Sequence, residues 1–170
     1  MQIPVEAHTS YDGGLDGAIN HFRRQGKRVR TNENIRVAVQ KWLKSADDEE
    51  LRQDAIQKYG HIKDWDTFLV TDMSALFKGK YSFNEDISKW NTSNVTNMSA
   101  MFADAKSFNH PIGEWNVGNV TDMSKMFKNA LRFNQPIGEW NVGNVTNMED
   151  ILKNTRKFKN WNRLQIQPGY

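Results

Sequence analysis

A 25-residue repeat constrains the fold of this chain more than any other feature of its 170-residue sequence. "WNVGNVTDMSKMF" begins at Trp115, and "WNVGNVTNMEDIL" begins 25 residues later at Trp140. Six apolar columns recur at this step. They are Ile62, Ile87, Ile112 and Ile137; Trp65, Trp90, Trp115 and Trp140; Val70, Val95, Val120 and Val145; Met73, Met98, Met123 and Met148; Phe77, Phe102, Phe127 and Leu152; and Phe83, Phe108, Phe133 and Phe158. Such a period predicts a solenoid, in which each coil buries its apolar edge by stacking on its neighbours.

Each copy is expected to hold a short extended segment followed by a helix. The spacing from Ile87 to Val95 in "DISKWNTSNV" approximates a leucine-rich repeat, in which an extended segment leads into a turn. Thr96 suits a helix N-cap, and the apolar residues after it have the i, i+3, i+4, i+7 spacing of a helix: Met98, Met101, Phe102 and Ala105. The predicted fold class is therefore an α/β repeat, a short leucine-rich-repeat-like right-handed solenoid. It has about four coils of 25 residues over residues 61–158.

The repeated line also resembles a known family. "FNQPIGEWNVGNVTNM", from Phe133 to Met148, and its copies are similar to the BspA-like leucine-rich repeat family of the surface-protein type. The similarity runs from Asn32 to about Phe158, and the segment from Ile35 to Phe77 resembles the one that opens such arrays. The resemblance implies a repeat fold and a binding or adhesive module without catalysis.

Residues 31–60 are predicted to form a helical N-terminal cap. Thr31 or Asn32 can cap a first helix with one apolar face: Ile35, Ala38, Val39, Trp42 and Leu43. Ser45 or Asp47 can cap a second helix, and Gly60 can end it. Its apolar face holds Leu51, Ala55, Ile56 and Tyr59. The flanks, residues 1–30 and 159–170, are expected to be an irregular basic arm and a C-terminal cap or tail.

The sequence offers no constellation for catalysis, a metal or a cofactor, so none is predicted. There is no cysteine, which excludes disulfides and thiolate sites. The four histidines, His8, His21, His61 and His110, have no metal-binding spacing. Glu114 and Glu139 would lie one coil apart, as in a carboxylate pair, but the repeat itself explains them. With no apolar run of about 20 residues and no secretory leader pattern, an intracellular or organellar location is slightly favoured over the cell surface.

Two asparagine columns recur with the apolar ones: Asn91, Asn116 and Asn141; and Asn94, Asn119 and Asn144. Asparagine side chains bond well to nearby backbone, so a ladder that holds the turns is favoured over ligand or glycan binding. Five glycosylation triplets begin at Asn91, Asn94, Asn97, Asn119 and Asn144, and the repeat generates such triplets automatically.

The candidate partner contacts lie in the basic arm and between the apolar columns. They are Arg23, Arg24, Lys27, Arg28 and Arg30 in the arm, and Lys89, Glu114 and Glu139 in the repeats. Other residues expected to be exposed are Asp104, Lys106, Lys128 and Arg132. The arm is either solvated, docked on the acidic second helix, or in contact with phosphates or an acidic protein surface.

The sequence therefore predicts a non-catalytic protein–protein interaction module, for example a small subunit of a larger assembly. The alternative is a cell-surface adhesin or a carbohydrate-binding fragment.

Overall fold

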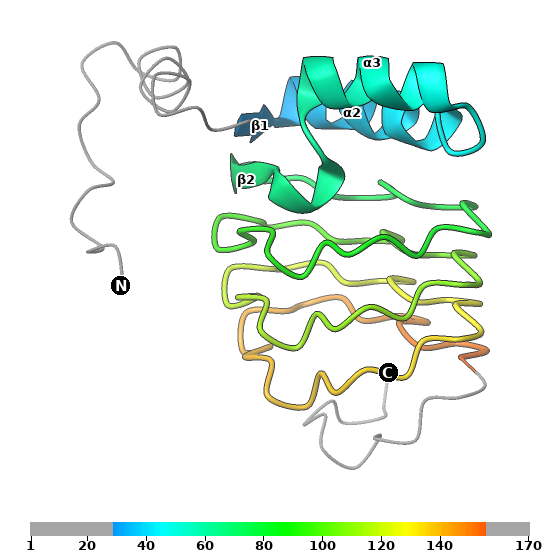
Figure 1. Ribbon diagram of the computed structural model, residues 1–170. Helices are drawn as coiled ribbons and strands as arrows, with labels where there is room; N and C mark the ends of the chain where they lie inside the picture. Colours follow the sequence, from blue (N-terminus) through cyan, green and yellow to red (C-terminus); the bar gives the residue numbers. More distant parts are fainter. Residues whose placement is uncertain (1–28, 156–170) are drawn as a thin grey trace, which may run out of the picture.

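The computed structural model describes residues 29–155, and Figure 1 shows two helices packed across one end of a column of stacked coils. The elements follow one another in the chain as strand β1 (Val29–Thr31), helix α2 (Asn32–Lys44), helix α3 (Glu49–Tyr59), 3-10 turn η2 (Ile62–Asp64) and strand β2 (Asp66–Leu69). Strands β1 and β2 pair in parallel, with Val29 opposite Asp66 and Thr31 opposite Leu69. The arm to residue 28, the tail from residue 159 and Phe158 lie outside the described residues.

The start of α2 is as predicted. Thr31 is its N-cap, and the Thr31 N–H donates to Asn34 Oδ1 at 3.2 Å. The helix then buries Ile35, Ala38, Val39 and Trp42 against the rest of the core, with Leu43 partly buried. The predicted apolar face therefore covers the top of the stack.

The start of α3 differs from the prediction. Its N-cap is Asp48, whose carboxylate accepts a hydrogen bond from the Leu51 N–H at 2.9 Å, and neither Ser45 nor Asp47 takes this role. Ser45 instead ends α2, and its hydroxyl donates back to the Trp42 carbonyl at 2.7 Å. Gly60 ends α3 with φ of 77°, as predicted. Leu51 is 49% exposed, so it was wrongly placed on the apolar face.

The helix predicted in each coil is wrong, because in residues 29–155 the segments after the Thr column are runs of turns. In one such segment, Ala100 and Asp104 have left-handed φ of 52° and 61°. Alternate N–H groups here donate to the next coil, from Met98, Ala100, Phe102 and Asp104 to the carbonyls of Asp122, Ser124, Met126 and Lys128 at 2.7–2.9 Å. These N–H groups therefore bond to carbonyls of the next coil, whereas in an α-helix they would bond to the carbonyl of residue i−4.

Directly before this segment, the N–H groups of each coil donate in the opposite direction, to the preceding coil. Thr96 and Asn97 donate their N–H groups back to the Thr71 carbonyl at 2.8 and 3.3 Å. Isolated parallel bridges join the same position of four successive repeats, at Asp72, Asn97, Asp122 and Asn147. Each step is one 25-residue repeat, so the repeat and the layer of the stack coincide.

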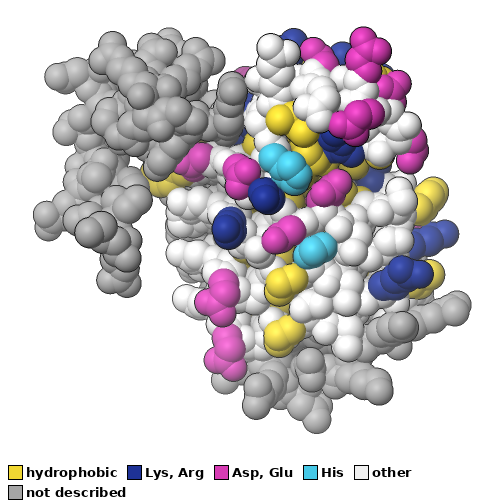
Figure 2. Space-filling view, in the orientation of Figure 1, with side chains coloured by type: hydrophobic (Ala, Val, Ile, Leu, Met, Phe, Trp, Pro, Cys, Tyr) yellow, Lys and Arg dark blue, Asp and Glu magenta, His cyan; other side chains and the backbone are white. Residues whose placement is uncertain are grey.

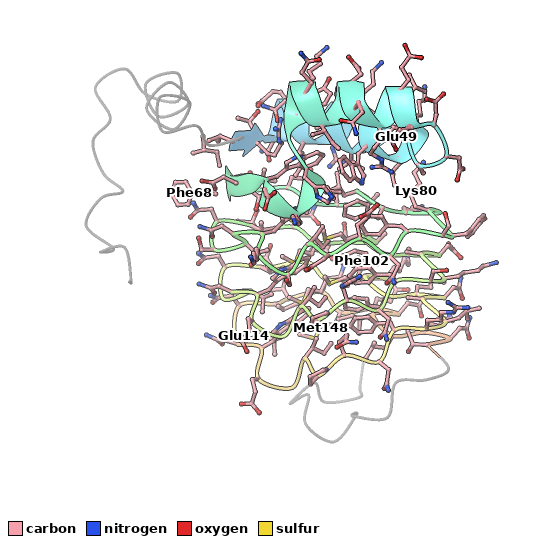
Figure 3. The ribbon with its side chains drawn as sticks, viewed as in Figure 1. Glu49, Phe68, Lys80, Phe102, Glu114 and Met148 are labelled. Carbon is pink, nitrogen blue, oxygen red and sulfur yellow. The ribbon has the colours of Figure 1, made fainter. Side chains whose placement is uncertain are left out.

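The core is a set of continuous side-chain columns along the stack. Phe102 lies at its centre (Figure 3), stacked at 5.6 Å between the rings of Phe77 and Phe127. Trp115 and Trp140 donate their indole N–H groups to the carbonyls of Ile87 and Ile112 at 3.3 and 3.2 Å. The Val and Met columns are buried until the last coil, where Val145 and Met148 become partly exposed.

The first coil is closed by side chains of α2. The Asn32 Oδ1 atom accepts from the N–H groups of Thr71 and Asp72 at 2.9 and 3.1 Å. The Thr71 carbonyl likewise accepts from the N–H groups of Thr96 and Asn97 in the next coil. The Asn32 carboxamide therefore stands where a preceding coil would place a peptide carbonyl. Arg36 completes the closure by donating to the Ser74 carbonyl at 2.7 Å.

Arg30 was predicted to lie in the exposed arm, and this is wrong. It belongs to β1 and is 6% exposed. Its guanidinium lies 4.8 Å from the centre of the Trp65 ring and donates to the Tyr59 carbonyl at 2.6 Å. The stacking and hydrogen bonding that suit arginine to buried sites make Arg30 part of the joint between cap and repeats.

Candidate functional site

The exposed residues singled out from the sequence lie on two different sides of the stack. Glu114 and Lys80, labelled in Figure 3, mark these two sides. The column of Lys89, Glu114 and Glu139 is on the first. Lys106 is on the second, and the Arg132 N–H donates to the Lys106 carbonyl at 3.1 Å. Arg23, Arg24, Lys27 and Arg28 lie outside the described residues. The structure therefore does not gather the predicted contacts into one site.

The first side carries a column of charged side chains. Asp64, Lys89, Glu114 and Glu139 occupy the same position of successive repeats and are all exposed. Figure 2 shows this face with acidic, basic and histidine side chains interspersed. Beside it, hydrogen bonds from Ser88, together with the charges of His110 and Lys89, lower the pKa of Asp86. A solvated column of mixed charge is suited to steering a partner more than to holding one.

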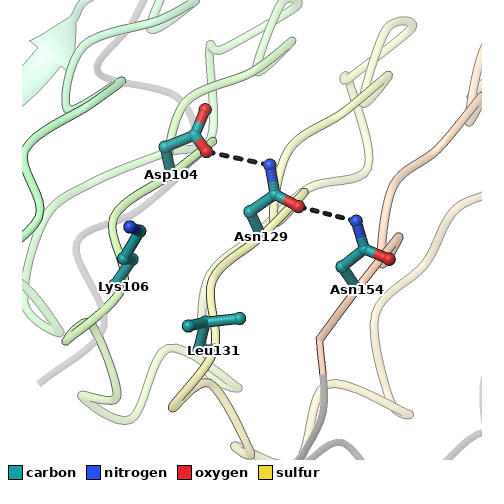
Figure 4. A pocket seen from close by; sticks show the side chains of 5 residues that line it. All are labelled: Asp104, Lys106, Asn129, Leu131 and Asn154. Carbon is teal, nitrogen blue, oxygen red and sulfur yellow. Dashed lines mark hydrogen bonds between the residues drawn. The ribbon is translucent and has the colours of Figure 1, made fainter.

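The second side contains a concave site, shown in Figure 4. We call it the side hollow: a volume of about 430 Å³ lined by Asp104, Lys106, Asn129, Leu131 and Asn154. Its polar wall is a chain of hydrogen bonds. The Asn129 Nδ2 atom donates to Asp104 Oδ1 at 2.8 Å, and Asn154 Nδ2 donates to Asn129 Oδ1 at 2.8 Å. Carboxylate and carboxamides are thus held at one-coil intervals, with lone pairs left for a ligand.

Backbone conformation explains why these residue types line the side hollow. Asp104, Asn129 and Asn154 have φ of 61°, 59° and 64°, and the same column begins with Gly79 at 70°. Glycine, asparagine and aspartate tolerate the left-handed region best among the amino acids. The column Gly–Asp–Asn–Asn is therefore a backbone signature that was readable in the sequence, although it was not used to predict this site.

An aromatic and basic rim borders the side hollow. Tyr81 is 59% exposed, and the Lys106 Nζ atom lies 4.6 Å from the centre of its ring. Lys80, which precedes Tyr81 in the chain, and Arg132, which follows Leu131, are also exposed. In Figure 2, basic side chains gather with apolar ones along the edge of the stack. Tyrosine and arginine are enriched at protein interfaces, so Tyr81 and Arg132 are the residues of this rim that suit a binding surface.

Lys128, predicted to be exposed, is instead half-buried and engaged with Asp150. Its Nζ atom lies 3.0 Å from the Asp150 carboxylate, and Lys153 lies at 3.0 Å from the other oxygen of that carboxylate. The hydrogen bonds from Lys128 and Lys153 lower the pKa of Asp150. Lys128 is therefore part of a local charge cluster at the end of the stack.

The asparagine ladders hold turns, as predicted. Asn91, Asn116 and Asn141 each accept from the backbone N–H two residues ahead, at 3.1, 3.0 and 3.2 Å. The second ladder crosses between coils: Asn94, Asn119 and Asn144 donate to the carbonyls of Phe68, Ser93 and Gly118. Their amides are thus used mainly within the stack.

Residues 29–155 contain no group of three or more histidine, aspartate or glutamate side chains placed to hold a metal ion. Neither helix in this part of the chain is long and apolar enough to cross a membrane.

Fold and surface together define a repeat protein built from stacked 25-residue coils under a helical cap. The chain belongs to the family described as "Mycoplasma protein of unknown function, DUF285", whose model matches residues 49–163. Among curated proteins and solved structures, none matches the chain.

Proposed function

We propose that this chain is a non-catalytic protein–protein interaction module, built as a short leucine-rich-repeat-like solenoid of the BspA-like type. The observation that carries the proposal is the side hollow with its exposed Tyr81–Lys106 pair. Tyrosine is enriched at interfaces and lysine is depleted there, so Tyr81 is the residue of this pair that suits an anchor beside the pocket. A role as a small subunit of a larger assembly fits this arrangement.

The rigidity of the frame supports the proposal. Two residues of the side hollow, Asp104 and Asn129, donate their own N–H groups to the next coil, to the carbonyls of Lys128 and Lys153 at 2.8 Å. Binding to such a surface orders few additional groups, which reduces the entropic cost of association. The same contacts make the repeats a scaffold that presents side chains at fixed intervals.

Carbohydrate binding is a second candidate, because the same hollow offers an aromatic ring near a carboxylate and two carboxamides. Planar amides and carboxylates can each bond two neighbouring hydroxyl groups of a sugar. Under this reading the chain would be an adhesin or carbohydrate-binding fragment, and the ring of Tyr81 would pack on the ligand.

The test compares two double variants of the full chain. Tyr81→Ala with Lys106→Glu removes the rim of the side hollow. Leu51→Ala with Lys41→Glu changes similar exposed residues on the cap, where Leu51 is 49% exposed and Lys41 is exposed. Tagged protein is purified from its native cells, recovered proteins are identified by mass spectrometry, and binding is remeasured with the purified partner by calorimetry. We expect the rim variant to lose at least about tenfold in affinity, or 1.4 kcal/mol, and the cap variant to keep it.

Unchanged affinity of the rim variant would refute this surface as the contact. A glycan array probed with the same proteins separates the second candidate, since a sugar ligand would bind the purified chain with no protein present.

The basic arm can be tested with a deletion that spares the fold. Removing residues 1–30 would take away Val29 and Arg30, which belong to β1 and to the joint with α3. A deletion of residues 1–28 leaves that joint intact. If Arg23, Arg24, Lys27 and Arg28 contact an acidic partner or phosphates, this deletion weakens co-purification, and the loss increases at low salt, where charge contacts are strongest. Co-purification that is unchanged would remove the arm from the interface.

A further inference from the structure

The chain of hydrogen bonds that lines the side hollow has a direction. The Asn154 Nδ2 atom donates to Asn129 Oδ1, and the Asn129 Nδ2 atom donates to Asp104 Oδ1, both at 2.8 Å. Each amide therefore donates toward the coil that lies nearer the cap. An asparagine at position 104 would continue this direction, but the ionised carboxylate of Asp104 has no proton to donate. The chain of donors consequently ends at Asp104, which can only accept.

One oxygen of the Asp104 carboxylate is left without a donor. In the part of the chain that the structure describes, the Oδ1 atom accepts from Asn129, whereas no hydrogen bond or ion pair reaches the Oδ2 atom. Figure 4 shows this second oxygen pointing away from Asn129. An ionised carboxylate accepts on both oxygens, so Oδ2 is available to a donor that this part of the chain does not supply.

The same position of the preceding coil has no side chain. Gly79 lies one repeat before Asp104, and its N–H donates to the Ala103 carbonyl at 2.8 Å, as the Asp104 N–H donates to the Lys128 carbonyl at 2.8 Å. A Cβ atom added to Gly79 would meet no atom within 4 Å. We call this opening the glycine notch: the space beside Gly79 in which the next member of the Asp104 column would stand.

A cation lies in the side hollow beside this carboxylate without pairing with it. The Lys106 N–H donates to the Asp104 carbonyl at 2.9 Å, so one tight turn holds both residues in the hollow. The Lys106 Nζ atom lies 4.6 Å from the centre of the Tyr81 ring, and it forms no ion pair with Asp104. The hollow therefore presents an acceptor and a donor that are not bonded to each other.

These two groups select the chemistry of a ligand. A cation could donate to Asp104 but would be repelled by Lys106, and a carboxylate would be repelled by Asp104. A primary carboxamide matches both groups, since its N–H donates and its carbonyl accepts. A sugar hydroxyl can also donate and accept, but only the carboxamide has a counterpart in the chain itself, where Asn129 donates to the other oxygen of Asp104.

We propose that the glycine notch receives the side-chain carboxamide of an asparagine or glutamine of a partner protein. The amide group donates to Asp104 Oδ2, and the carbonyl oxygen accepts from the Lys106 ammonium group. The partner thereby supplies the member of the ladder that Gly79 lacks. This inference rests on the proposed interaction module and names the side-chain chemistry that the side hollow would recognise.

The first test titrates the full chain with N-acetyl-L-asparagine N-methylamide and follows the backbone amide signals by NMR. The signals of Gly79, Asp104 and Lys106 should shift together and saturate with a Kd of about 1 mM, the range of a contact made by one side chain. The corresponding aspartate and lysine compounds replace the carboxamide by a carboxylate and an ammonium group, and methyl glucoside offers sugar hydroxyls. Each of these three probes should bind at least about tenfold more weakly.

Two variants check where the asparagine probe binds. Gly79→Asn places the chain's own carboxamide in the glycine notch, at a φ of 70° that asparagine tolerates, and should weaken probe binding at least about tenfold. Ala75→Asn adds the same side chain at another left-handed position of the same coil, exposed and with φ of 53°, and should leave binding unchanged. Circular dichroism verifies that both variants are folded. If Gly79→Asn unfolds, the comparison between probes decides.

Three outcomes would overturn the inference. The asparagine probe could leave the three signals unshifted. The lysine compound or methyl glucoside could bind more tightly, which would mean that the hollow takes a cation or a sugar. The Gly79→Asn variant could bind the probe as well as the wild type does, which would place the contact elsewhere.

None of these results depends on the cellular partner, so this inference can fail without the proposed function failing. Affinity for the purified partner separates the two directly. If the double variant of Tyr81 and Lys106 loses that affinity while Gly79→Asn keeps it, the interaction module stands and the glycine notch is refuted.

Discussion

Replacing Phe102 with alanine tests whether the aromatic columns form the core that holds the coils together. Phe102 is 0% exposed and contacts rings in its own coil and in both neighbouring coils. Its ring centre lies 4.0 Å from that of Phe108 and 5.6 Å from those of Phe77 and Phe127, and Trp115 lies at 6.2 Å.

The expected loss follows from this environment. A buried Phe→Ala change costs about 3–5 kcal/mol, from lost transfer energy and the cavity left behind. Each stacked pair adds about 0.5–1.5 kcal/mol beyond the buried area. With several ring partners and close-packed coils on both sides, we expect the upper end, about 5 kcal/mol. This is a third or more of the stability of a typical domain, about 5–15 kcal/mol.

Urea unfolding followed by tryptophan fluorescence and circular dichroism measures the loss. The midpoint should fall sharply, and the melting temperature should fall by about 10–20 °C at roughly 2–4 °C per kcal/mol. Phe102→Leu is the matched control, because the same column already holds Leu152, and it should cost only about 1–2 kcal/mol. A loss below about 1 kcal/mol for the alanine variant, at unchanged urea dependence, would refute a cooperative aromatic core.

Three further changes test other parts of the stack. Trp115→Phe keeps an aromatic ring but leaves the buried Ile87 carbonyl without its indole donor, so we expect a loss of about 1–3 kcal/mol by urea unfolding. Gly113→Ala would place a Cβ atom 2.5 Å from a backbone carbonyl of the next coil, and should cost about 1–3 kcal/mol in the same assay. For Asp72, burial raises the pKa, but hydrogen bonds from its own turn and the charge of Arg36 outweigh it and hold the pKa below its ordinary value. Its contribution is therefore present at neutral pH and disappears as the pH falls below about 4. Compared with Asp72→Asn, the wild type should be more stable by under about 1 kcal/mol at pH 6, because the pair is partly exposed, with no advantage near pH 2. An advantage that grew on acidification would contradict this.

The repeat made the apolar columns predictable, but it did not reveal the backbone between them. Met98, Met101, Phe102 and Ala105 all point into the core, and a chain of turns that buries these four has the same spacing as a helix. The distinguishing feature is left-handed φ at positions such as Ala100. Alanine does not signal that conformation, so local residue preferences could not separate turns from helix here.

The candidate site was only partly predictable for a related reason. Asp104 and Lys106 were picked out as charged residues that fall between apolar columns. Tyr81 shares the column of Lys106, which reads Tyr, Lys, Leu and Arg, but it was not picked out because it carries no charge and that column shows no repetition. Positions that stack must resemble one another, whereas positions that face a partner are free to differ. Arg30 shows the opposite error, because a basic run in sequence hides one member that stacks on Trp65.

The carboxamide of Asn32 gives the stack a fixed origin. It takes the place that a peptide carbonyl of a preceding coil would hold, so these N–H groups of the first coil are already bonded. Below it, each layer meets the next through the same backbone bonds and the same ring contacts. Duplication of a 25-residue unit would insert a layer without altering either neighbour. In evolutionary terms, the length of such a protein can change by whole repeats while its first layer stays the same, and chains of different length would remain compatible with one N-terminal cap.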